Sequence, residues 1–339
     1  MKKPIVIAIL SALLALSAFS SLLIGRYDIT PSEAFGVISH NIFGAETTAS
    51  AEAISVINIV RAPRIFMCLL VGAALSASGA AYQGLFRNPL VSPDILGVSS
   101  GAAVGASIAI ILSLNAFGAL SFAFIFGLGT VFLVSSISLA FGGGRLNTYA
   151  MILAGVVFGS LCNAVVSLLK YLSDAETKLP EITFWLMGTM SRSGAIENAA
   201  IMLFAFAIGF TPLYLLRWRI NLLSFGEEEA RSLGVNARST GLIIIFSATL
   251  LCAASVSICG VIGWIGLIVP HIARGIVGAD YRVLLPASAL LGSILVLWTD
   301  TIARSLSASE IPLGILTAFV GAPIFIYLLY KNSIVKSRL

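Results

Sequence analysis

Few residues of this 339-residue chain could do chemistry, because only 10% of its residues are charged and 58% are hydrophobic. Asp300 and Arg304 stand four positions apart in an apolar stretch, a spacing that places both side chains on one face of a helix. A carboxylate in such surroundings can relay protons or ions, but a neighbouring arginine can also neutralise it. We interpret Asp300 and Arg304 as a satisfied ion pair, and a proton relay is the alternative.

Other patterns that would indicate catalysis are missing from the sequence. No Gly-Lys pair occurs anywhere, so the phosphate-binding loop of ATPases is absent. His40 and His271 are the only histidines, which excludes a His-rich metal site, and we interpret His271 as structural rather than as a haem or metal ligand. The four cysteines lie in apolar runs, as buried small hydrophobic residues do. The sequence therefore predicts no enzyme, no metal site and no cofactor of the chain's own.

The densest group of charges lies in residues 217–238. The seven charged residues of this stretch are Arg217, Arg219, Glu227, Glu228, Glu229, Arg231 and Arg238. Three adjacent acids followed by an arginine suit the start of a helix, where negative charge is favourable. A long charged loop without a catalytic pattern predicts a docking surface for a soluble partner, and a merely solvated charged helix is the alternative.

Long apolar segments separate the charged residues described above, and the structure formed by these segments must hold the charged residues in place. A soluble domain is about 25% charged, so the composition indicates a polytopic membrane protein. We predict an all-α chain that forms a single domain, 1–339, of about ten transmembrane helices. The predicted segments are approximately 4–25, 63–84, 94–113, 117–140, 149–170, 197–216, 239–260, 262–278, 283–306 and 311–330. The third and eighth are short or interrupted by Gly and Pro, and the first is predicted to be an uncleaved helix rather than a signal peptide.

The distribution of charge predicts the orientation of the helices. An even number of spans puts both termini on one side, and that side then carries most of the 20 Lys and Arg residues. The positive-inside rule makes it the cytoplasm, so residues 217–238 and Asp94 are predicted there as well. Asp94 is also predicted to cap the helix that follows it. Gly101 and Gly105 place small residues on one helix face, which predicts close helix packing.

Six sequence blocks occur in a distinctive order. They are Arg61-Ala-Pro-Arg64, Asn88-Pro-Leu-Val-Ser-Pro93, Gly226-Glu-Glu-Glu-Ala-Arg-Ser-Leu-Gly234, Gly263-Trp-Ile-Gly-Leu-Ile-Val-Pro-His271, Arg282-Val-Leu-Leu-Pro286 and Pro312-Leu-Gly-Ile-Leu-Thr-Ala-Phe-Val-Gly-Ala-Pro323. Together they resemble the FecCD family, the permeases of ABC importers for iron-siderophores, haem and vitamin B12. The resemblance spans nearly the whole chain.

The resemblance implies a fold and a set of partners. It implies the type II ABC importer permease fold, ten helices per subunit, and a homodimer in the inner membrane with the pathway on its two-fold axis. It also implies two cytoplasmic ATPase subunits that use ATP and Mg²⁺, and a periplasmic substrate-binding protein; no nucleic acid is expected. The cargo is expected to be a metal chelate, first a ferric siderophore, with haem, cobalamin and molybdate-type oxyanions left open. A stand-alone secondary transporter or channel is the alternative.

The resemblance also assigns roles to three sets of residues. The ATPase-coupling set is Glu227, Glu228, Glu229, Ala230, Arg231, Leu233 and Gly234. The set that docks the binding protein is Arg61, Arg64 and Arg304, for which snorkelling at the membrane interface is the alternative. The cytoplasmic gate set is Asn88, Leu90, Thr148 and Tyr149. Relatives tend to have a small polar residue at the position of Tyr149. The Tyr149 side chain is expected either to narrow the cytoplasmic exit or to anchor its helix at the membrane interface.

Overall fold

The computed structural model describes residues 3–143, 147–191, 196–307 and 309–336. Within these ranges every regular element is a helix. In chain order they are α1 (Lys3–Leu23), α2 (Pro31–Phe43), α3 (Ala51–Ser55), the π-helical η1 (Val56–Arg61), α4 (Ala62–Leu85), the 3₁₀-helical η2 (Pro93–Leu96), α5 (Val98–Ile111), α6 (Ala116–Phe141), α7 (Thr148–Leu172), α8 (Lys178–Met187), α9 (Ile196–Leu215), α10 (Arg217–Phe225), α11 (Glu227–Ser232), α12 (Ala237–Cys259), α13 (Ile265–Val277), α14 (Tyr281–Leu306) and α15 (Leu313–Lys336).

Ten of these helices match the ten predicted segments in order. Seven helical stretches in the described chain are long and apolar enough to cross a membrane, and three shorter apolar helices accompany them. The short ones are α5, α13 and residues Leu313–Leu328 of α15. The prediction that the third and eighth segments are short is therefore confirmed for α5 and α13. The helix containing α4 begins earlier than predicted, because α3, η1 and α4 run on as one stretch, Ala51–Leu85.

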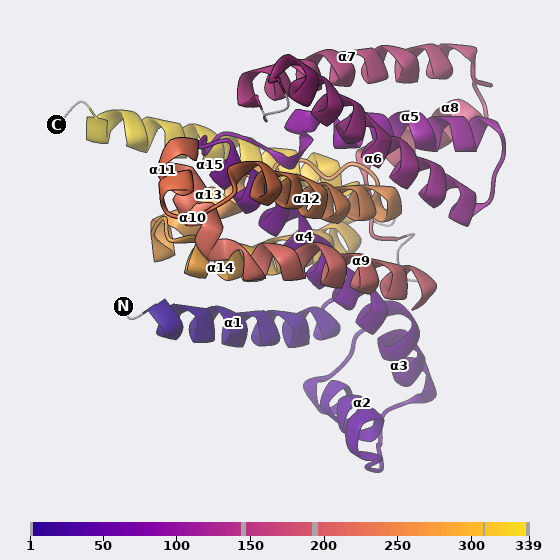
Figure 1. Cartoon of the computed structure of the whole chain (residues 1–339). Coiled ribbons are helices and arrows are strands. Elements are labelled where there is room, and N and C mark those ends of the chain that lie inside the picture. Colours follow the sequence, from indigo (N-terminus) through magenta and orange to yellow (C-terminus); the bar gives the residue numbers. More distant parts are fainter. Residues whose placement is uncertain (1–2, 144–146, 192–195, 308, 337–339) are drawn as a thin grey trace.

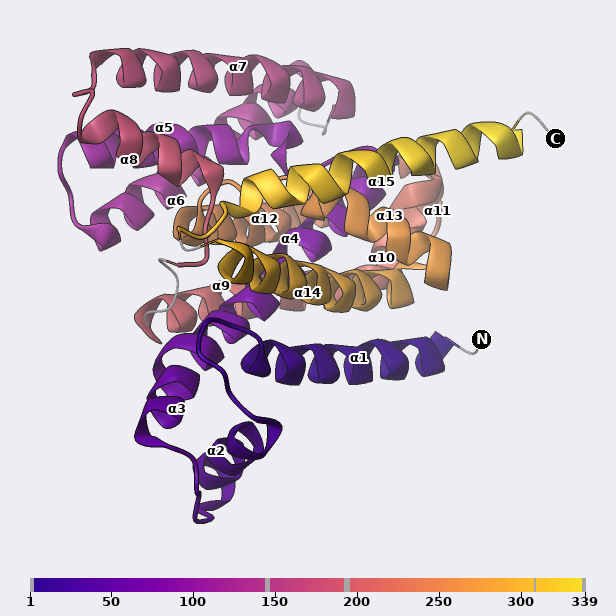
Figure 2. The same cartoon turned by 180° about the vertical axis from the view of Figure 1, so that it is seen from behind.

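The long helices lie side by side in one bundle (Figures 1 and 2). The first turn of α1, the last turn of α15 and both short helices α10 and α11 lie at one end of this bundle, which we call the terminal end. Helices α2 and α3 lie near the opposite end, which we call the far end. Both termini thus share one side with residues 217–238, as the even number of spans predicted.

Helix α4 forms the core of the bundle, and nearly all its side chains are buried. It approaches its neighbours so closely that a Cβ atom added to Gly72 would overlap the backbone of Gly292 in α14. A Cβ atom added to Gly79 would overlap Gly266 in α13 in the same way. Small residues permit such backbone approach in membrane bundles, where packing rather than hydrophobic burial joins the helices.

The predicted small-residue face on α5 is confirmed. Added Cβ atoms at Gly101 and Gly105 would overlap backbone oxygens of Phe126 and Phe122 in α6. Helices α5 and α6 therefore pack in close backbone contact.

The chain between α12 and α13 is not helical, and the segment after α8 joins the end of α12 to the start of α15 beside it. Gly260 and Trp264 have φ of 73° and 71°, a left-handed conformation that a tryptophan rarely adopts. Thr189 N–H donates to Cys259 O at 2.7 Å, and Leu313 N–H donates to Gly188 O at 3.0 Å. These bonds join the segment after α8 to the end of α12 and the start of α15. Broken backbone in a membrane requires such partners.

Candidate functional site

The terminal end is built from α10 and α11, which follow α9 and pack onto the bundle. Ile220 and Leu223 stand three positions apart on α10, and both are buried where α10 contacts α4 and α14. Gly226 then turns the chain with a φ of 144°, a conformation that favours glycine. Ala230 is fully buried and anchors α11, which contacts α10 and α12. The apolar residues thus fix two short helices whose remaining faces point outward.

Most of the predicted coupling set is exposed at this end. The exposed members are Glu228, Glu229, Arg231, Leu233 and Gly234. Gly234 has a φ of 78°, and it follows α11 in the left-handed conformation typical of a helix end. Ala230 is the buried member, and the side chain of Glu227 lies outside the described part of the chain. A surface of alternating charge with one exposed leucine can bind a protein partner.

A polar contact that the sequence did not reveal ties α10 to α14. Asn221 donates from Nδ2 to Asp280 Oδ1 at 2.8 Å and accepts Tyr281 N–H at 2.8 Å. Lys3 Nζ lies 3.0 Å from Asp280 Oδ2. Partial burial raises the pKa of Asp280, but the hydrogen bonds from Lys3, Asn221 and the Arg282 N–H outweigh it and lower that pKa to about 2. The only signal in the sequence was an aspartate placed to cap a helix.

At the far end, two of the three predicted docking arginines hold the chain itself. Arg61 is 4% exposed and donates to the carbonyl oxygens of Leu22 and Tyr27. Arg304 donates to Ser21 O at 2.6 Å. Both guanidinium groups therefore fasten the end of α1 and the segment after it to the bundle. The sequence placed these arginines on the side opposite the termini, but it did not predict that Arg61 is buried or that both arginines bind backbone carbonyls.

Arg64 is bound by two carboxylates from distant parts of the chain. Its Nε and Nη2 donate to the Asp300 carboxylate at 2.8–3.1 Å, and its Nη1 and Nη2 donate to Glu310 at 3.0 and 2.9 Å. The predicted ion pair of Asp300 with Arg304 is present but long, with 3.9 Å between Arg304 Nε and Asp300 Oδ2, and Arg64, which the sequence did not suggest, is the closer partner at 2.8 Å. Helix periodicity identifies the residue four positions from Asp300, which is Arg304. It cannot show that the packing of α4 against α14 brings Arg64 closer to the Asp300 carboxylate.

The predicted gate residues occupy two separate places. Asn88 accepts the Leu90 N–H at 2.9 Å and shapes the turn after α4, where both residues are exposed. Thr148 begins α7, and Tyr149 is 87% exposed beside it. Within one chain Asn88, Leu90 and Tyr149 are exposed, and Thr148 is half-buried. An exposed tyrosine and leucine at an apolar helix end are surfaces that a second molecule could cover.

Asp94 is exposed, and it faces a cavity between the helices. It lines a cavity of about 200 Å³ together with Leu75 of α4 and Cys252 of α12. Its carboxylate accepts the Ser99 N–H at 3.1 Å, so the predicted capping of the next helix is confirmed. The chain re-enters the bundle at Pro93, whose ring lies against Gly266. Proline-broken backbone is tolerated there because it lines a cavity.

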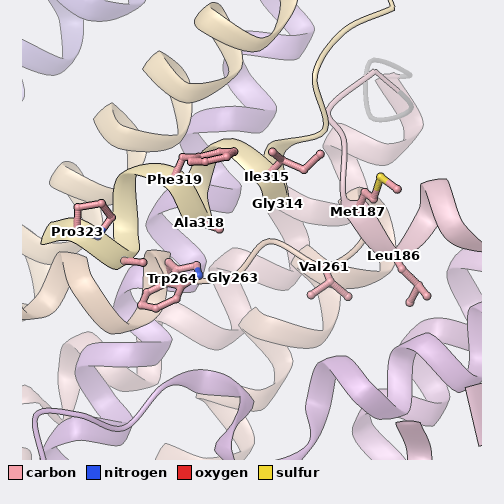
Figure 3. A pocket seen from close by; sticks show the side chains of 11 residues that line it. Leu186, Met187, Val261, Gly263, Trp264, Gly314, Ile315, Ala318, Phe319 and Pro323 are labelled. Carbon is pink, nitrogen blue, oxygen red and sulfur yellow. The ribbon is translucent and has the colours of Figure 1, made fainter. Parts of the chain in front are cut away.

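An apolar groove of about 710 Å³ opens between α8, the segment after α12, and α15. Figure 3 shows Val261 and Trp264 on one side and residues of α15, including Ala318 and Phe319, on the other. The Trp264 ring also meets Phe325 edge-on, with centroids 6.2 Å apart. The lining contains no charged residue. Such a surface can accept apolar parts of a cargo or of another helix, and it does not favour an ion.

Known proteins resemble the chain along nearly its whole length. The model of the FecCD transport family matches residues 13–331. The chain belongs to this family. It is 43% identical to the molybdate import system permease protein MolB of Haemophilus influenzae, over 95% of this chain and 94% of MolB. It is also 43% identical to the cobalamin import system permease protein BtuC of Halobacterium salinarum, over 86% of this chain and 77% of BtuC.

A solved structure shares the fold. It is described as an inward-facing conformation of an ABC transporter assigned to the metal-chelate type, and it is 40% identical with a TM-score of 0.84. The match covers 97% of this chain and all of that one. This FecCD chain is therefore a membrane-spanning permease subunit of an ABC importer of the metal-chelate class, and it is not an enzyme. Membership of this family argues against the alternative prediction of a stand-alone secondary transporter or channel.

Proposed function

We propose that two copies of this permease enclose a pathway through the inner membrane, and that a cytoplasmic ATPase docks on α10 and α11. The observation that carries the proposal is that α11, a short helix anchored by the buried Ala230, exposes its charged side chains. The terminal end is then cytoplasmic, with both termini. The ATPase subunits bring ATP and Mg²⁺, because the chain has no phosphate-binding loop of its own.

The proposed mechanism is alternating access. Nucleotide binding in the ATPase moves α10, and α10 contacts α4 and α14. The Asn221–Asp280 hydrogen bond lets α14 follow that movement. The ATPase and the substrate-binding protein each make different contacts with the two conformations of the permease dimer. This difference in contacts shifts the equilibrium between the two conformations.

The substrate-binding protein docks at the far end in this proposal, on the periplasmic side. Arg61, Arg64 and Arg304 gather there around one cavity, and arginine forms bidentate contacts with the carboxylates of a partner. Their present partners belong to the chain itself. Docking therefore requires an exchange of partners.

The exit gate is proposed to form between copies rather than within one. Leu90 and Tyr149 are exposed in the single chain, as residues that close a passage at a dimer axis would be. Cysteines at Asn88 and Thr148 are expected to cross-link across the dimer in one nucleotide state and much less in the other. Cross-linking that ignores nucleotide would contradict the gate.

The cargo is proposed to be a metal chelate. Two relatives of equal identity are named for molybdate and for cobalamin, so identity does not separate the cargoes. An apolar groove without charged lining residues suits cargo of varied shape. Selection then falls to the binding protein. A ferric siderophore is the first candidate, and haem, cobalamin and molybdate are to be compared with it.

Reconstitution tests the proposal directly. The permease is placed in proteoliposomes with its ATPase and its binding protein, and uptake of the four labelled cargoes is measured. We expect uptake of one of them that requires ATP, ATPase and binding protein together. A vesicle without the ATPase is the control, and uptake in that control would contradict the proposal.

A further inference from the structure

Arg64 binds two carboxylates that differ in how firmly they are held. Asp300 projects from the body of α14, and its side chain is 2% exposed. Glu310 lies between α14 and α15, its side chain is 29% exposed, and its φ is 52°. A non-glycine residue in that left-handed region is uncommon. Of the two partners, Glu310 is the one that a competitor from outside the bundle can displace.

The surroundings of Arg64 have room and charge for a further carboxylate. A cavity of about 240 Å³ is lined by four arginines, Arg26, Arg61, Arg64 and Arg304, and by two acids, Asp300 and Glu310. Asp28 lies close enough to Arg61 to act on it electrostatically. Positive groups still outnumber negative ones, so an incoming carboxylate meets net attraction.

Glu310 is also connected to the groove. The residues after it hold α15 in place, since Ile311 N–H donates to Ala303 O at 3.3 Å and Leu313 N–H donates to Gly188 O at 3.0 Å. Leu313 is 2% exposed and begins α15, the helix that forms one side of the apolar groove. Release of Glu310 from Arg64 would remove one fixed point immediately before that helix.

We infer that Glu310 is an internal placeholder, which occupies Arg64 until an acidic side chain of the docking protein replaces it. The replacement keeps Arg64 paired and frees the start of α15, so that docking and movement of the groove wall are coupled. This inference rests on the docking role proposed above. It assigns Glu310 a regulatory role, because Glu310 competes with the partner and does not bind the cargo.

Affinity for the partner tests the inference. The permease–ATPase complex is placed in nanodiscs, and its fluorescently labelled cognate substrate-binding protein is titrated onto it. Glu310→Gln keeps the size of the side chain but removes the competing charge, so it is expected to lower the Kd about fivefold or more. Glu52→Gln, which removes an exposed acid from α3, is the matched control and is expected to change the Kd less than about twofold.

Two outcomes separate this inference from the docking proposal. An unchanged or higher Kd for Glu310→Gln overturns the placeholder, and so does an equal decrease with Glu52→Gln. Docking by arginine is tested on the unmodified complex, since contacts between charges weaken when salt rises from about 0.05 to about 0.5 M. Binding that ignores this change in salt overturns the docking itself, whatever Glu310→Gln does.

Discussion

Charged side chains gather at both ends of this bundle, but the two ends use them differently. At the far end, Arg61 and Arg64 are buried, and each donates to atoms of its own chain. At the terminal end, Glu228 and Arg231 are exposed on a six-residue helix. The same residue types therefore bind the chain itself at the far end and remain available to a partner on α11.

This difference follows from how each end is built. At the far end, Arg64 projects from α4 and Asp300 from α14, two helices in close backbone contact. At the terminal end, the buried Ala230 anchors α11, and its charged residues Glu228, Glu229 and Arg231 are exposed. Buried ion pairs are costly to break, whereas exposed ones contribute little. A partner can bind the terminal end without rearrangement, and at the far end it must displace an internal contact.

The largest predicted effect comes from breaking the far-end cluster. Asp300→Asn leaves Glu310 as the anionic partner of Arg64, in a site where the Asp300 side chain is 2% exposed. We expect the free energy of unfolding to fall by about 3 kcal/mol, because the change leaves a buried charge with one partner fewer. Unfolding of the purified permease in mixed detergent micelles measures it.

The terminal end provides the control for that measurement. Glu228→Gln removes an exposed charge and is expected to change the free energy of unfolding by less than about 0.5 kcal/mol. Similar losses for Asp300→Asn and Glu228→Gln would remove the distinction between the two ends.

The reverse pattern is expected for coupling. The double change Glu228→Arg with Arg231→Glu should leave the fold intact but lower substrate-stimulated ATP hydrolysis about tenfold, since like charges would then face the ATPase. The rate is measured in proteoliposomes with the ATPase and binding protein present. Full stimulation with normal complex formation would show that these charges merely face water.

The sequence was sufficient to predict the order and approximate positions of ten apolar helices, of which seven described stretches are long enough to cross a membrane. Hydrophobic length alone determines a span, and the short third and eighth segments were recognised from their glycines and prolines. The positive-inside rule also grouped both termini with residues 217–238, and the structure places them at one end.

The partners of the charges could not be predicted in the same way. Arg64 and Asp300 are 236 positions apart, and Asn221 and Asp280 are 59 apart. Only the packing of α4 and α10 against α14 brings them together. Local spacing identified Arg304, which lies 3.9 Å from Asp300, but it could not identify the closer partner Arg64. Contacts between helices depend on packing detail that a single sequence does not display.

The smallest predicted effect concerns pH and the contact of Asp280 at the terminal end. Its pKa is about 2 in the folded chain, below its ordinary value of 3.8, so its ionised form stabilises the fold. That stabilisation is present above about pH 4 and is lost as pH falls through about 2. Asp280→Asn keeps the helix cap but removes the charge, and at pH 7 it is expected to cost about 0.5 kcal/mol, because Lys3 and Asp280 are partly exposed. The difference between the two proteins, followed by thermal unfolding in detergent, should shrink as the solution is acidified towards pH 2. A difference that grows on acidification would mean that the ionised carboxylate does not stabilise this end.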